Sequence, residues 1–208
     1  MDEISSQIAA VREALSSRPE GLQAHVGRVL EEALDLAGRW DLDPARVELA
    51  VWGHDLFRAA PAAEQLQLAA ECGLRPTETE RRLPVLLHGP NAAVVLRERF
   101  GVRDDEVLAG VREHTSGGAA MPAIAKVILL ADKFEKRKRT RRPELASIRR
   151  AARRDLDLAL LCWADWKWVD ERERTWECDE AHWEARLRWV ADHHSEIGLP
   201  GRTPDDGS

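Results

Sequence analysis

The 208-residue chain lacks the features that mark several large classes of protein. No apolar run approaches the ~20 residues of a membrane-spanning helix, so no membrane partner is expected. The three cysteines, Cys72, Cys162 and Cys178, are widely spaced and odd in number, which fits neither a disulfide framework nor a thiolate zinc site. A net charge of −6 lacks the basic excess typical of nucleic-acid binding proteins, so no nucleic-acid partner is expected either.

The first residues also lack the character of a secretory signal. The segment MDEISSQIAAVREAL is acidic and amphipathic, whereas a signal peptide is basic at first and then continuously apolar. We therefore expect a cytoplasmic location.

A period-two alternation of apolar and polar residues is missing as well, so strands are not expected. Glycine and proline instead divide the chain into segments with a helical period. The sequence predicts an all-α fold: a single helical bundle with a C-terminal helical extension. The expected parts are an N-terminal helix at 1–19, a core at 20–142, C-terminal helices packed on the core at 143–197, and a flexible tail at 198–208.

Several helix boundaries follow from prolines and capping residues. Pro44, with Asp43 as N-cap, is expected to begin a helix that runs to about Phe57. Other expected helices include one that begins after a break at Gly89 and Pro90, and those at 104–114, 121 to about 138, 143 to about 170, and about 179–197.

Histidines and aspartates stand in apolar surroundings in several of these helices. Burying either group unpaired costs several kcal/mol, so each needs a partner. One buried histidine is more often a hydrogen-bonded core residue than a ligand, but four of them with two aspartates favour a metal centre. Nitrogen and oxygen ligands without thiolate suit iron, manganese, zinc or cobalt. The residues are His25, His54, Asp55, His88, His114 and Asp132.

Asp132 and the basic run that follows it each allow an alternative explanation. Asp132 ends the apolar stretch VILLAD, and Lys133 or Lys136 is an alternative partner to a metal ion. The basic run KFEKRKRTRRPE that follows from Lys133 is most simply a solvated helix face.

Tryptophan is concentrated near the C-terminus, with six of eight at or beyond Trp163. Trp163 continues the apolar stripe of Leu156, Ala159 and Leu160, which predicts core packing or a dimer seam. Stacking of one tryptophan on a nucleobase is the alternative.

The order His, His-Asp, His, His, Asp on successive helices resembles the HD superfamily of metal-dependent phosphohydrolases. The phrases LLHGPNAA, VREHTSGG, MPAIAKVILLADKFE and ARRDLDLALL resemble, over about residues 20–165, the YqeK-type family of symmetrical bis(5′-nucleosyl)-tetraphosphatases. The basic run after Asp132 and the tryptophan-rich segment after Trp163 differ from that family's pattern.

The resemblance implies an HD-domain core with all six residues as metal ligands, and His54, Asp55 and Asp132 as the catalytic centre. It implies two metal ions, typically iron, although manganese, cobalt, zinc or magnesium stay open. A metal-bound hydroxide would cleave diadenosine tetraphosphate into two ADP. Alternatives are another nucleotide substrate, or a non-catalytic nucleotide-binding module; a homodimer is also left open. Candidate phosphate contacts are Arg58, Thr115, Gly117, Lys133, Lys136 and Arg137.

Overall fold

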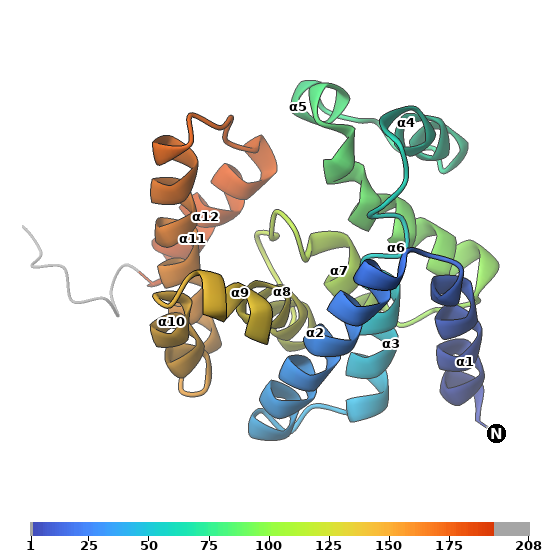
Figure 1. The fold of residues 1–208 in the computed structure, drawn as a ribbon, viewed down its shortest axis with the longest axis horizontal. Coiled ribbons are helices and arrows are strands. Elements are labelled where there is room, and N and C mark those ends of the chain that lie inside the picture. The colour runs from blue at the N-terminus through green and yellow to red at the C-terminus, as the bar shows by residue number, and fades with distance from the viewer. Residues whose placement is uncertain (1, 194–208) are drawn as a thin grey trace, which may run out of the picture.

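The computed structural model describes residues 2–193 as twelve α-helices and one short 3₁₀ helix, with no strand in that range (Figure 1). The all-α prediction is confirmed. None of the described helices is both long and apolar enough to cross a membrane. The helices are α1 (Glu3–Ser16), α2 (Glu20–Arg39), α3 (Pro44–His54), α4 (Ala62–Glu71), α5 (Glu78–Arg82), the 3₁₀ helix η1 (Pro84–Leu87), α6 (His88–Arg99), α7 (Asp105–Glu113), α8 (Ala123–Phe134), α9 (Lys136–Arg141), α10 (Leu145–Ala152), α11 (Leu156–Glu173) and α12 (Glu180–His193).

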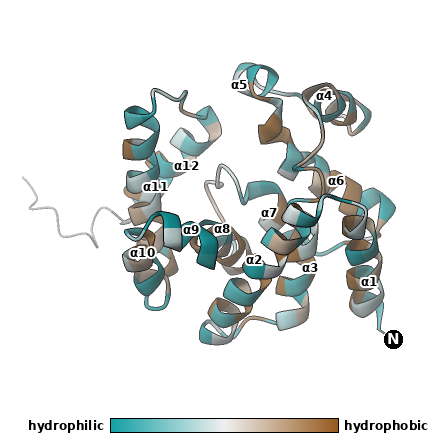
Figure 2. Ribbon diagram, viewed as in Figure 1, coloured by the Kyte–Doolittle hydropathy of each residue, from teal (hydrophilic) through white to brown (hydrophobic). Residues whose placement is uncertain are grey.

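Helix α8 is the centre of the bundle. Its sequence AIAKVILLADKF is apolar on nearly every side, which is the composition of a helix enclosed by others. Helices α2, α7, α10 and α11 all pack against it, and α3 packs between α1, α2 and α7. In Figure 2 the neighbouring α9 is mostly teal, because its sequence KRKRTR is hydrophilic, and none of its residues is buried.

The C-terminal helices continue the same core. Helices α10 and α11 pack on α8, and α12 packs on α11 (Figure 1). One cluster of buried apolar side chains extends from Val11 in α1 to Trp189 in α12. The segment boundaries at 19, 142 and 197 stay predictions, and the expected tail and the last residues of the expected final helix lie outside the described residues.

Four expected helix boundaries are wrong. Helix α6 starts at His88 and runs through Gly89 and Pro90. Pro90 is tolerated in the first turn because the N–H that it lacks has no acceptor within the helix there. The expected helix at 121–138 stops at Phe134, because Glu135 is extended (φ −51°, ψ 150°) and its carboxylate accepts from the N–H of Arg137 to begin α9.

The third wrong boundary lies after Pro143, where two helices replace the long one. Asp155 is extended (φ −156°, ψ 113°), and its side chain accepts from the N–H groups of Asp157 and Leu158, so α11 begins anew. Helix α3 also ends at His54, before the expected Phe57. Helix α5 was not predicted, although Thr77 and Glu80 form a capping box at its start.

Trp163 is 1% exposed, so the core-packing role predicted for it is confirmed. Trp168, Trp176 and Trp183 are exposed, and stacking of one tryptophan on a nucleobase stays a prediction.

Candidate metal centre

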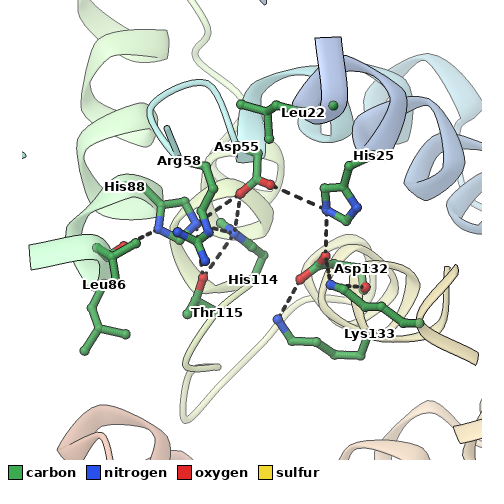
Figure 3. Close-up of a pocket in the computed structure, with 13 residues that line it drawn as sticks. Leu22, His25, Asp55, Arg58, Leu86, His88, His114, Thr115, Asp132 and Lys133 are labelled. Atoms are coloured by element: carbon green, nitrogen blue, oxygen red, sulfur yellow. Dashed lines mark hydrogen bonds and ion pairs between the residues drawn. The ribbon is translucent and has the colours of Figure 1, made fainter. Parts of the chain in front are cut away.

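Asp55 lies at the centre of the site, immediately after α3, with His25, His88 and His114 around it in Figure 3 and His54 preceding it in the chain. Its Oδ1 is 3.1 Å from His88 Nε2 and 3.5 Å from His114 Nε2. Its Oδ2 is 3.5 Å from His25 Nε2 and 3.6 Å from His54 Nε2. One carboxylate therefore joins two groups of potential ligands, one on each of its oxygens.

Three of the histidines are oriented by the backbone in the same way. The Nδ1 of His54 is 2.6 Å from the carbonyl oxygen of Val51, and the Nδ1 of His114 is 2.8 Å from that of Val111. His88 makes the equivalent contact with Val85. Because a carbonyl oxygen can only accept, each Nδ1 carries a proton, and each Nε2 presents its lone pair to the site.

These lone pairs have no positive partner among the described residues around them. His54 is fully buried, and its Nε2 has no hydrogen-bond partner. The Nε2 atoms of His88 and His114 lie only 2.9 Å apart, a separation that requires either a proton between the two nitrogens or a cation beside both lone pairs. Burial lowers the pKa of His54, and it lowers the pKa of His114 to about 4, so neither histidine supplies that charge itself at neutral pH.

The two groups fit a divalent metal ion. They are His25, His54 and Asp55, and Asp55, His88 and His114, in each of which the ligand atoms lie within 4.8 Å of one another. Metal bonds of about 2.1 Å to nitrogen and oxygen place neighbouring ligand atoms roughly 3 Å apart, close to the separations around Asp55. The neutral imidazoles and the ionised carboxylate are the forms that metals bind.

Asp132, in the last turn of α8, lies on the His25 side of the cavity (Figure 3). Its Oδ1 is 3.1 Å from His25 Nε2 and 2.6 Å from Lys138 Nζ, and its Oδ2 is 2.6 Å from Lys133 Nζ. Burial acts to raise the pKa of Asp132, but the two ammonium groups hold it well below the usual range. Ion pairing by a lysine was one of the two expectations for Asp132, and the partners are Lys133 and Lys138 rather than the exposed Lys136.

Glu135 is a residue of the site that the sequence analysis missed. It is 2% exposed and lies in the break between α8 and α9, where its Oε1 is 3.9 Å from His25 Nδ1 and its Oε2 is 2.7 Å from Arg28 Nε. The signal available in the sequence was an acidic residue near the start of a basic run. Its carboxylate faces the side of the His25 ring that is turned away from Asp55.

Gly89 allows α6 to approach α7 closely at the site. A Cβ at this position would lie 2.9 Å from the carbonyl oxygen of Val111 and 3.2 Å from His114 Cε1. Any side chain would therefore push His88 away from His114.

The ligands open into a cavity of about 510 Å³. Of the expected phosphate contacts, Arg58, Thr115 and Lys133 line it, and Lys138 is an addition. Lys136 and Arg137 are exposed and do not line it, and Gly117 lies against the ring of Trp189 instead. All these contacts with substrate stay predictions.

Comparison with known proteins agrees with the geometry. The chain is 31% identical over 154 residues to a symmetrical bis(5′-nucleosyl)-tetraphosphatase of Bacillus subtilis, covering 74% of this chain and 80% of the relative. This chain belongs to the symmetrical bis(5′-nucleosyl)-tetraphosphatase family. The tetraphosphatase of Halalkalibacterium halodurans is 33% identical over 137 residues, covering 66% of this chain and 72% of that protein.

The fold of this chain is also found in a solved structure. The crystal structure of an HD superfamily hydrolase described as involved in NAD metabolism, from Clostridium acetobutylicum, matches with a TM-score of 0.82. The match covers 88% of this chain and 97% of the other at 24% identity, and shows that the two chains share one fold. No family model matches the chain.

Proposed function

We propose that this protein hydrolyses dinucleoside tetraphosphates at the middle of the phosphate chain and releases two nucleoside diphosphates, with diadenosine tetraphosphate as its substrate. The observation that carries the proposal is the set of buried, unprotonated histidine nitrogens directed at Asp55 in a cavity with basic side chains. The activity in the names of the relatives from Bacillus subtilis and Halalkalibacterium halodurans supports it.

Two divalent ions, iron by preference, are proposed for the two groups of ligands. His25, His54 and Asp55 would hold one, with Asp132 as an added carboxylate, and Asp55, His88 and His114 would hold the other. When bound, such ions neutralise phosphate charge and make water acidic enough to supply a nucleophile near neutral pH.

The chain itself contributes orientation and charge. Since the Nδ1 protons of His54, His88 and His114 are held by backbone carbonyls, these rings serve as ligands rather than as proton donors. Arg58 and Lys133 present positive charge to the cavity, where the phosphates of a substrate would lie. The Thr115 hydroxyl is 3.1 Å from His114 Nε2, and with a metal ion on that nitrogen it would be free to donate to a phosphate or water oxygen.

The test is product analysis on protein loaded separately with iron(II), manganese, cobalt, zinc and magnesium. Diadenosine tetraphosphate is expected to give ADP alone, whereas asymmetric cleavage would give AMP and ATP and would contradict the proposal. Nucleoside mono- and triphosphates and a guanosine polyphosphate, assayed in parallel, are expected to react more slowly. A metal-loaded protein that cleaves none of these compounds would favour a binding module.

A further inference from the structure

A second cavity, of about 280 Å³, adjoins the metal-site cavity. The two share Lys133 and Lys138 as lining residues, so these ammonium groups form a common wall. Beyond that wall the second cavity is lined from α9, α11, the residues that follow each of them, and Leu145 of α10. The segments of α9 and α11 are the two in which the sequence differs from the pattern of the family.

The second cavity carries a surplus of positive charge. Five of its lining residues are basic, and Asp170 is its acidic lining residue; they are Lys133, Lys138, Arg141, Arg142 and Arg174. Lys133 and Lys138 pair with Asp132, and Arg142 and Arg174 both pair with Asp170. Arg141 has no carboxylate partner among residues 2–193 and is exposed, so its guanidinium is available to an anion.

The same cavity has an aromatic wall. Trp166 is partly buried, and its indole N–H donates to Glu144 Oε1 at 3.1 Å, which holds the ring in one orientation. The Arg142 guanidinium lies over one face of that ring, 5.8 Å from its centre. An aromatic face beside guanidinium groups suits a ligand with a flat base and a phosphate tail, because bases stack on indole rings and arginine binds phosphate oxygens.

We propose that this second cavity binds one nucleoside diphosphate half of the substrate, with its base against Trp166 and its phosphates between Arg141 and the shared Lys133 and Lys138. This inference rests on the proposed function. Symmetrical cleavage requires the middle of the tetraphosphate chain to lie at the metal ligands, so the two diphosphate halves must extend from that point in two directions. The metal-site cavity holds one half, and the basic, aromatic cavity across the lysine wall holds the other.

The first test counts binding sites for ADP, which is the product and lacks the bond to be cleaved. Calorimetric titration of the metal-loaded protein is expected to give two ADP per chain. Arg141→Ala and Trp166→Leu are expected to leave one. Arg150→Ala, which removes an exposed arginine that lines neither cavity, is the matched control and is expected to keep two.

The second test separates binding from the chemical step. Arg141→Ala and Trp166→Leu are each expected to raise KM for diadenosine tetraphosphate about tenfold with kcat nearly unchanged, as loss of one stacking or phosphate contact predicts. Trp166→Phe keeps an aromatic face and is expected to restore most of the affinity. If Trp166→Leu fails to fold, the exposed Arg141→Ala variant still decides the result.

The outcomes distinguish this inference from the proposed function. One ADP per chain in the unmutated protein, or variants that match Arg150→Ala in both stoichiometry and KM, would overturn the second subsite even if cleavage into two ADP is observed. Two ADP per chain that fall to one in the variants would support the subsite even if diadenosine tetraphosphate is not cleaved.

Discussion

Two buried histidines, His54 in the central bundle and His182 in the C-terminal helices, look alike when each is considered alone. The Nδ1 of each lies within hydrogen-bond distance of a backbone carbonyl oxygen, that of Val51 for His54 and that of Ser116 for His182. The Nε2 of each is buried without a hydrogen-bond partner.

Their surroundings differ completely. The ring of His54 lies 4.8 Å from that of His114, centre to centre, and its Nε2 faces Asp55. The ring of His182 packs against those of Trp163, at 4.9 Å, and Trp189, at 6.4 Å. Burial, and then the positive charge of Lys167, lower the pKa of His182 to about 3. A lone pair without a partner is therefore no sign of a metal site unless further ligands and a negative charge converge on it.

The largest effect is expected from Asp55→Asn, because Asp55 is the only residue common to both ligand groups. Metal content is expected to fall at both sites, and the rate of hydrolysis by about 10³-fold, since each tenfold in rate corresponds to about 1.4 kcal/mol of lost stabilisation. Metal analysis and ADP release measure the two effects. Asp105→Asn, which changes an exposed carboxylate, is the control. Unchanged metal content in the Asp55 variant would remove the basis of the metal centre.

The comparison between the two histidines is tested directly by exchanging each for glutamine. His54→Gln is expected to lose metal from its group and to slow hydrolysis about 10²-fold, because a ligand is lost. The His182→Gln protein is expected to keep the metal content and most of the activity of the unmutated protein. Metal loss in the His182 variant, or an unchanged metal content in the His54 variant, would show that convergence of ligands does not determine which histidine binds metal.

A smaller effect is expected from Lys138→Met. In the structure Lys138 donates to both the carboxylate and the backbone carbonyl of Asp132, so its ammonium group competes with a metal ion for that carboxylate. Removing it is expected to tighten metal binding on the His25 side about tenfold, within the range for changes next to a ligand. Titration of the metal-free protein measures this, with Arg150→Met as the control. Weaker binding would show that Lys138 supports the ligand instead.

The smallest effect concerns stability and pH. The pKa of His182 is about 3 in the folded protein, against 6.5 for an ordinary histidine. Between pH 3 and 6.5 the histidine binds a proton in the unfolded chain but not in the folded protein. The free energy of unfolding therefore falls as the pH falls below 6.5. His182→Gln removes this contribution, which amounts to about 1.4 kcal/mol between pH 7.5 and 5.5. Urea unfolding at pH 7.5 and 5.5 measures the difference, and parallel curves for the two proteins would contradict the assignment.

Helix boundaries show which parts of the fold the sequence could predict. Asp43 with Pro44, and Asp104, mark helix starts through their own side chains and backbone, and both starts were predicted correctly. The break at Glu135 was missed because local patterns continue the helix, whereas Arg28 in α2 holds the Glu135 carboxylate in place from a distant part of the chain. A local pattern of apolar residues cannot predict contacts between distant segments of the chain.

The amino-acid sequence alone determined the helical class, the six residues proposed as metal ligands and the family, because these depend on residue type, spacing and order. Only the tertiary structure decided how they are used. It placed His54 beside Asp55 and His182 between tryptophans, paired Asp132 with Lys138, and set Arg141 and Trp166 in a cavity next to the metal site. The physical reason is that a side chain's charge, burial and lone-pair direction lead to metal binding, ion pairing or core packing according to the residues around it. Most of those residues belong to other helices.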